Sequence, residues 1–125
     1  MINRPLYYEK IKPFVNKPLI KVITGIRRCG KSTMMLLIQE LLIKEGVERE
    51  QIISINFESL QYYEVRTALT LYNYVAEEVQ TRKKPVYLFF DEIQLVHAWE
   101  EAINSLFLDY NADIYITGSN SQLLS

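Results

Sequence analysis

The chain has 125 residues, of which 49% are hydrophobic and 23% charged, and its net charge is −1. This composition is typical of one globular domain with a core, and the balanced charge excludes a uniformly basic nucleic-acid-binding surface. The single cysteine excludes an internal disulfide. No apolar run is long enough for a membrane span and no signal peptide is evident, so we expect a cytoplasmic protein without a membrane partner.

The first elements are predicted from proline, β-branched and apolar residues. Residues 1–18 contain three prolines and several aromatic residues, which indicates an irregular lead-in. Residues 19–24 are rich in β-branched side chains and predict a first strand. Residues 31–44 become almost continuously apolar, and Gly46 follows where a helix C-cap would lie, so we expect a buried helix. We therefore divide the chain into a lead-in, 1–18, and a partial core, 19–125.

A phosphate-binding pattern, G-x-x-x-x-G-K-[ST], lies between this strand and this helix. Its residues are Gly25, Ile26, Arg27, Arg28, Cys29, Gly30, Lys31 and Ser32. Glycines let successive backbone N–H groups surround an anion, and the helix N-terminus adds the positive end of its dipole. In such a loop the lysine reaches the β- and γ-phosphates and the hydroxyl ligates Mg²⁺. The order of strand, loop and helix predicts a nucleotide phosphate site.

The remaining elements alternate between strands and helices. We expect a strand at 52–57, a loop at 58–63, and strands at 86–90 and 114–117. A helical stripe is formed by Val65, Leu69, Tyr72, Ala76 and Val79, and a second helical face by Trp99, Ile103, Leu106 and Phe107. The order β-α-β-α-β-α-β predicts an α/β fold, a three-layer α-β-α P-loop NTPase domain with a parallel sheet that stops after its fourth core strand.

Two acids, Asp91 and Glu92, follow the apolar run at 86–90. Ligands of open α/β sheets bind at the carboxyl ends of the strands, where these acids are expected. We interpret Asp91 as a Mg²⁺ ligand opposite the Ser32 hydroxyl, and Glu92 as the base that polarises the attacking water. At the tip of the fourth strand, Ser119 or Asn120 is the candidate sensor of the γ-phosphate, and the sequence does not choose between them.

These motifs together resemble P-loop ATPases of the AAA+ group, and more closely a prokaryotic AAA-type ATPase family. That family is marked by G-x-R-R-x-G-K-[ST], D-E-I-Q and T-G-S, which correspond here to residues 25–32, 91–94 and 117–119. The resemblance implies binding of ATP and Mg²⁺ by Lys31, Ser32 and Thr33, with Asp91 on the metal and Glu92 as base. It also implies Mg-dependent ATP hydrolysis coupled to conformational change, and a homo-oligomer in the full-length protein. An unidentified protein or DNA partner stays open.

Members of this family are far longer, and the resemblance implies a strand order of 5-1-4-3-2. We therefore interpret the chain as a fragment in which the first strand lies at a sheet edge, and we expect self-association through that edge. Because catalysis in AAA+ proteins usually needs a neighbouring subunit's arginine, we expect the isolated chain to be weakly active or inactive.

Two alternative functions remain. One is a non-catalytic regulatory switch that binds ATP or ADP. The other is a nucleoside kinase, because thymidine kinases also join a G-K-S-T loop to a D-E-x-Q segment. Their zinc-binding cysteines are missing here, since Cys29 is the single cysteine.

Overall fold

The computed structural model describes residues 19–23 and 30–118. Its strands are β1 (Ile20–Ile23), β2 (Ile52–Asn56), β3 (Tyr87–Asp91) and β4 (Asp113–Thr117). Its α-helices are α2 (Gly30–Lys44), α3 (Ala68–Gln80) and α4 (Trp99–Tyr110). Its short 3-10 helices are η2 (Arg49–Gln51), η3 (Leu60–Val65) and η4 (Ile93–Leu95). The four predicted strands are therefore present, and the segment expected to be a loop at 58–63 contains the start of η3.

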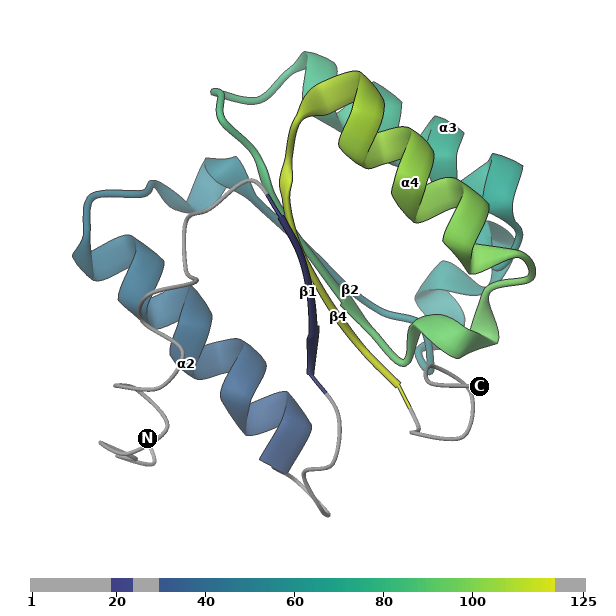
Figure 1. The fold of residues 1–125 in the computed structure, drawn as a ribbon, viewed down its shortest axis with the longest axis horizontal. Helices are drawn as coiled ribbons and strands as arrows, with labels where there is room; N and C mark the ends of the chain where they lie inside the picture. The colour runs from purple at the N-terminus through teal and green to yellow at the C-terminus, as the bar shows by residue number, and fades with distance from the viewer. Residues whose placement is uncertain (1–18, 24–29, 119–125) are drawn as a thin grey trace.

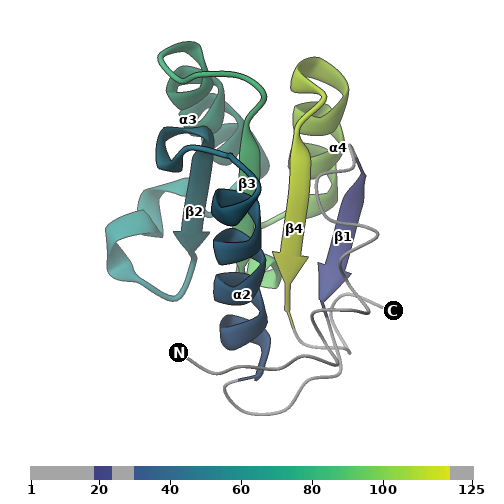
Figure 2. The same cartoon turned by 90° about the vertical axis from the view of Figure 1, so that its left-hand side faces the viewer.

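All four strands are parallel, in the order β1-β4-β3-β2, and helices cover both faces of the sheet. Figure 1 shows α2 on one side of the sheet and α3 with α4 on the other. Figure 2 looks across α2 onto the four strands, which lie side by side. This arrangement confirms the predicted three-layer α/β fold, and the order of the four strands agrees with the expected one. The carboxyl ends of all strands meet at one edge of the sheet.

The core consists of two hydrophobic clusters, one on each face of the sheet. Alternate side chains of β3 enter opposite clusters, because successive residues of a strand point to opposite faces. Leu88 and Phe90 pack on the α3–α4 side, whereas Phe89 packs on the α2 side. There the ring of Phe89 stacks on that of Tyr115, with centroids 4.6 Å apart, and Met34 of α2 joins the same cluster. Burial on both faces explains why β3 reads as a continuous apolar run.

The predicted apolar stripe of the second helical segment is only partly right: Val79 is buried, but Leu69 is exposed and Val65 lies outside the helix. Helix α3 begins after Thr67, whose side chain caps the helix by accepting from the Thr70 backbone N–H, so Val65 precedes the helix. The buried face of α3 is Leu71, Val75 and Val79, and Leu69 is 69% exposed. Two overlapping apolar stripes run along this segment, and packing on the sheet decides between them.

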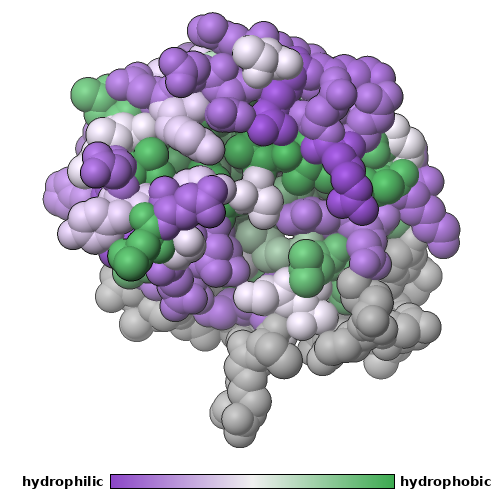
Figure 3. All heavy atoms as spheres, turned by 180° about the vertical axis from the view of Figure 1, so that it is seen from behind, coloured by the Kyte–Doolittle hydropathy of each residue, from purple (hydrophilic) through white to green (hydrophobic). Residues whose placement is uncertain are grey.

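Strand β1 pairs only with β4 among the described residues, and Leu19 and Val22 beside this edge are about half exposed. The first strand therefore forms an edge of the described sheet, as expected. Viewed from the opposite side to Figure 1, apolar side chains gather mainly in a band across the middle, with hydrophilic side chains around it (Figure 3). Within the described residues, no helix has the length and apolar character that crossing a membrane requires.

Candidate functional site

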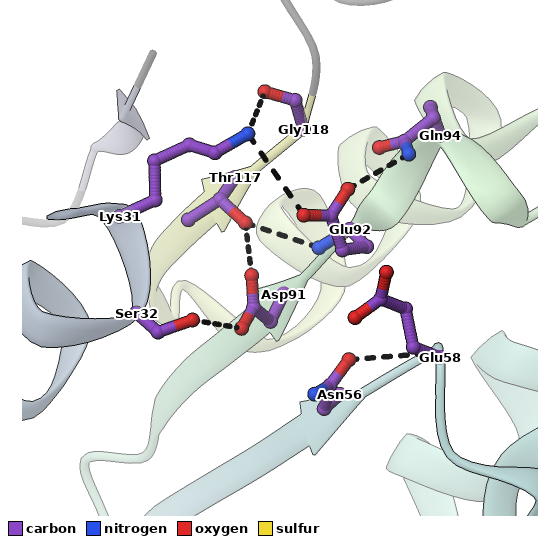
Figure 4. A network of polar contacts seen from close by, with 9 residues as sticks. All are labelled: Lys31, Ser32, Asn56, Glu58, Asp91, Glu92, Gln94, Thr117 and Gly118. Carbon is purple, nitrogen blue, oxygen red and sulfur yellow. Dashed lines mark hydrogen bonds and ion pairs between the residues drawn. The ribbon is translucent and has the colours of Figure 1, made fainter. Parts of the chain in front are cut away.

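The N-terminus of α2 brings Lys31 and Ser32 to the carboxyl edge of the sheet (Figure 4). The Nζ of Lys31 donates a hydrogen bond to the Gly118 carbonyl just beyond β4, at 2.9 Å. The same nitrogen lies 3.8 Å from Glu92 Oε2. The lysine amine therefore lies near the ends of β3 and β4 and belongs to the first turn of α2. Both the amine and the helix terminus favour an anion at this place.

Ser32 and Asp91 meet across the gap between α2 and β3. The Ser32 Oγ donates to Asp91 Oδ2 at 3.1 Å, although the two residues are 59 positions apart in the chain. A hydroxyl and a carboxylate are hard oxygen donors of the kind that Mg²⁺ uses when it also binds phosphate oxygens. No group of three or more His, Cys, Asp or Glu residues that could hold a metal occurs in the part of the chain that the structure describes. The chemistry of this pair fits a Mg²⁺ ion that also binds phosphate oxygens of a nucleotide.

Thr117, the last residue of β4, connects Asp91 at the end of β3 with Glu92, the residue that follows it. The Thr117 side chain is fully buried, and its hydroxyl donates to Asp91 Oδ1. The same oxygen accepts the backbone N–H of Glu92 at 3.0 Å. One side chain thus contacts both acids, a link that our sequence analysis did not assign.

Glu92 has a left-handed backbone, with φ 59° and ψ 50°. This conformation is uncommon outside glycine, and such outliers gather at functional sites. The left-handed residue ends β3, begins η4 and leaves the carboxylate beside Lys31 (Figure 4). Gln94 Nε2 donates to Glu92 Oε1 at 2.8 Å, whereas the buried Gln94 Oε1 has no hydrogen-bond partner among the described residues. Gln94 is a second contact that we did not predict, although it belongs to the D-E-I-Q motif.

The end of β2 lies on the other side of Asp91. The backbone N–H of Phe57 donates to the Asp91 carbonyl at 3.1 Å, and Arg66 donates two hydrogen bonds to the Phe57 carbonyl. Asn56 Oδ1 accepts the Glu58 backbone N–H at 3.0 Å. Figure 4 shows the Glu58 carboxylate turned toward the two acids, but it has no hydrogen bond or ion pair to another described residue. These contacts hold the loop after β2 against the end of β3.

The structure therefore brings together four of the predicted site residues: Lys31, Ser32, Asp91 and Glu92 (Figure 4). Gly30 begins α2 and is buried, and Thr33 lies half-buried in its first turn. Other predicted positions lie outside the described residues: Gly25, Ile26, Arg27, Arg28, Cys29, Ser119 and Asn120. The lead-in at 1–18 also lies outside them.

Comparison with known proteins places this geometry in a family. The family model of an AAA domain matches residues 17–125. An uncharacterized protein of Haemophilus influenzae is 38% identical over 125 residues, which cover all of this chain and 31% of that protein. An uncharacterized protein of Methanocaldococcus jannaschii is also 38% identical over 125 residues, which cover 25% of its length. The chain thus spans a third or less of these two relatives, and no solved structure matches it.

The family match and the three-layer fold agree with each other, and both indicate a nucleotide-binding, ATPase-like domain. The chain belongs to the family of AAA domains.

Proposed function

We propose that this domain binds ATP with Mg²⁺ and that its parent protein hydrolyses the γ-phosphate. The observation that carries the proposal is the convergence of an amine, a hydroxyl and two carboxylates at one sheet edge. Lys31, Ser32, Asp91 and Glu92 come from two elements and meet within hydrogen-bond or ion-pair distance. The amine suits the negative phosphates of a nucleoside triphosphate, and the hydroxyl and carboxylates suit its Mg²⁺ ion and the attacking water.

In this proposal, the α2 N-terminus and Lys31 hold the phosphates. Lys31 Nζ leaves the Gly118 carbonyl, its present partner at 2.9 Å, and donates to β- and γ-phosphate oxygens. The residues that would hold Mg²⁺ are Ser32 and Asp91, already 3.1 Å apart. The cation, when bound, neutralises charge on the phosphate oxygens. Gly30 and Thr33, with the loop residues 25–29, complete the proposed phosphate site.

Glu92 is the proposed general base. Its carboxylate accepts a proton from a water molecule as that water attacks the γ-phosphorus. The bond from the γ-phosphorus to the bridging oxygen breaks, so that the products are ADP and inorganic phosphate. Positioned bases of this kind contribute a factor of about 10²–10⁴ to the rate. Ser119 or Asn120 would sense the γ-phosphate from the end of β4.

The partners of the whole protein follow from the family rather than from the site. We propose a cytoplasmic homo-oligomer in which a neighbouring subunit completes catalysis and hydrolysis drives a conformational change. Because a neighbouring subunit would complete catalysis in this proposal, we expect the isolated domain to be weakly active or inactive.

A non-catalytic nucleotide switch is the second candidate function. One observation favours it: both carboxylate oxygens of Glu92 have partners, Gln94 at 2.8 Å and Lys31 at 3.8 Å. Both oxygens are thus engaged by protein groups, as expected of a carboxylate with a structural role. In a switch, ATP and ADP would bind at the same phosphate site and no phosphate would be released.

Calorimetric titration with Mg·ATP and Mg·ADP tests the proposed binding. Lys31→Ala removes a charged donor, which corresponds to an affinity loss of about 10- to 100-fold. Lys44→Ala is the matched control, because this exposed lysine lies at the opposite end of the same helix and the charge change is identical. Equal affinities of wild type and Lys31→Ala would contradict the phosphate site.

Phosphate release then separates the ATPase from the switch. Glu92→Gln keeps the shape of the side chain but removes the base, so we expect unchanged ATP affinity and turnover reduced at least about 100-fold. The assay should use both this chain and a form that spans the length of the relatives. ATP binding without phosphate release in the longer form would favour the switch.

A further inference from the structure

The hydroxyl of Thr117 occupies the position where the backbone pairing of β3 with β4 ends. The register of the two strands runs from Tyr87 opposite Asp113 to Phe90 opposite Ile116. The next residues in each strand, Asp91 and Thr117, are joined by their side chains instead. The side-chain contact therefore continues the strand pairing by one residue, and that residue is an acid of the proposed metal site.

The direction of both hydrogen bonds of Thr117 follows from the groups involved. A hydroxyl has one hydrogen to donate and lone pairs to accept. The backbone N–H of Glu92 can only donate, so the Thr117 oxygen accepts it at 3.0 Å. The hydroxyl hydrogen is then available for the Asp91 carboxylate, and Thr117 Oγ1 contacts Asp91 Oδ1. Asp91 Oδ2 is left to face Ser32.

We propose that Thr117 is the positioning residue of both acids: its one hydroxyl orients the Asp91 carboxylate toward Ser32 and anchors the left-handed backbone of Glu92. This inference rests on the proposed function, in which Asp91 holds the cation and Glu92 is the base. Thr117 itself is fully buried and acts through the acids rather than by contact with the nucleotide. The adjacent Gly118 carbonyl accepts a hydrogen bond from Lys31. The end of β4 therefore contacts both the lysine of the phosphate-binding pattern and the two acids after the third apolar strand.

A side chain of the same shape tests the hydroxyl separately from packing. Thr117→Val keeps the branched shape and removes the hydroxyl, whereas Thr117→Ser removes a methyl group and keeps the hydroxyl. Circular dichroism and thermal unfolding check that both variants are folded. If the hydroxyl positions the acids, Thr117→Ser keeps the wild-type Glu92 amide exchange and Mg²⁺ dependence that Thr117→Val loses. If the site needs only a packed side chain, Thr117→Val stays closer to the wild type in both measurements.

The first readout needs no nucleotide. Amide hydrogen exchange of Glu92, measured by NMR on the nucleotide-free chain, reports the bond to Thr117. We expect exchange about tenfold faster in Thr117→Val, the factor for one neutral hydrogen bond, and near wild type in Thr117→Ser. In the wild type, the Thr117 hydroxyl proton should itself be slow to exchange. A fast-exchanging hydroxyl in the wild type would overturn the proposal even if the valine variant did not fold.

The second readout is the gain in ATP affinity that Mg²⁺ provides. Groups that orient metal ligands typically contribute about 10- to 100-fold to metal affinity or activity, so Thr117→Val should lose a factor in this range. ATP affinity in EDTA should stay unchanged, because Lys31 and the α2 N-terminus are intact. Wild-type Mg²⁺ dependence and wild-type Glu92 exchange in Thr117→Val would refute the proposal. Failure of the wild type to bind ATP, with Glu92 exchange still governed by Thr117, would instead refute the proposed function alone.

Discussion

Glycine at position 92 should give a more stable domain than alanine at the same position, the reverse of the order found in helices. Both substitutions remove the carboxylate and its contacts with Gln94 and Lys31, so their difference isolates the backbone. Glu92 has φ 59° and ψ 50°, and its N–H is held by Thr117 in either variant. The left-handed conformation is therefore expected to persist after substitution.

The magnitude follows from two opposing backbone effects. A residue with a Cβ loses about 1–2 kcal/mol in the left-handed conformation, which glycine avoids. Glycine loses about 0.5–1 kcal/mol more than alanine when the chain is ordered. The net expectation is that Glu92→Gly exceeds Glu92→Ala in free energy of unfolding by about 0.5–1 kcal/mol.

The control is the same pair of substitutions at Asn104, an exposed residue inside α4. There the helical backbone favours alanine, and the glycine variant should be the less stable by about 1 kcal/mol. Urea denaturation followed by circular dichroism measures all four variants. If glycine is the less stable partner at both positions, the left-handed strain at Glu92 is absent and the reasoning fails.

Three further predictions concern the packing of the core, the stability of the fold at alkaline pH and the exposed edge of the sheet. Leu106→Ala should lower the free energy of unfolding by about 3–5 kcal/mol, because Leu106 of α4 is fully buried in the larger hydrophobic cluster. Leu108 is 79% exposed, so Leu108→Ala should change the free energy of unfolding by less than about 0.5 kcal/mol. Equal effects of the two substitutions in urea denaturation would contradict this packing. Burial, together with the Asp113 carboxylate, raises the pKa of Tyr87 above its ordinary 10.0. As the pH rises, Tyr87 therefore ionises in the unfolded chain before it ionises in the folded chain. The stability that the neutral side chain contributes is fully present below pH 10.0 and is lost as the pH rises through the raised pKa of the folded state. In urea denaturation at several pH values, Tyr87→Phe should show a smaller loss of stability above pH 10.0 than the wild type. Sedimentation should show concentration-dependent self-association, reduced in Val22→Lys, and a single monomeric species in the wild type would argue against pairing through β1.

The positions of the four strands could be predicted because each strand has a clear local signal, whereas their order in the sheet was expected from the resemblance to AAA-type ATPases. The buried run before Asp91 has no polar interruption, and helical segments separate it from the neighbouring strands. Parallel strands connected by helices leave few topologies to consider. All four strands accordingly begin and end within one residue of the predicted positions.

The buried face of α3 could not be predicted in the same way. Its sequence carries apolar residues on two overlapping stripes, and both satisfy helical spacing. The choice depends on where the helix begins and how it lies on the sheet. Thr67 provides the start, since its hydroxyl accepts the Thr70 N–H, and this places Leu71 rather than Leu69 against the core.

Some residues of the candidate site could be predicted from the sequence and others could not. Lys31, Ser32, Asp91 and Glu92 were predicted because their chemistry belongs to short motifs with fixed spacing. The roles of Thr117 and Gln94 were missed, because they depend on a left-handed backbone at Glu92 and on the end of a strand pair. Neither feature has a signal in residue spacing.

The two hydrophobic clusters have a mechanical consequence for the proposed site. Lys31 and Ser32 belong to α2, which packs in the smaller cluster of the described residues through Met34 and Met35 near the site and through Ile38 and Leu42 farther along the helix. Asp91 is the last residue of β3, which both clusters hold from opposite faces, and Glu92 follows it directly. Methionine side chains are flexible and tolerate sliding better than branched ones. If the site closes around a ligand, we therefore expect the methionine-packed N-terminal end of α2 to move more than Asp91, which the sheet holds from both faces.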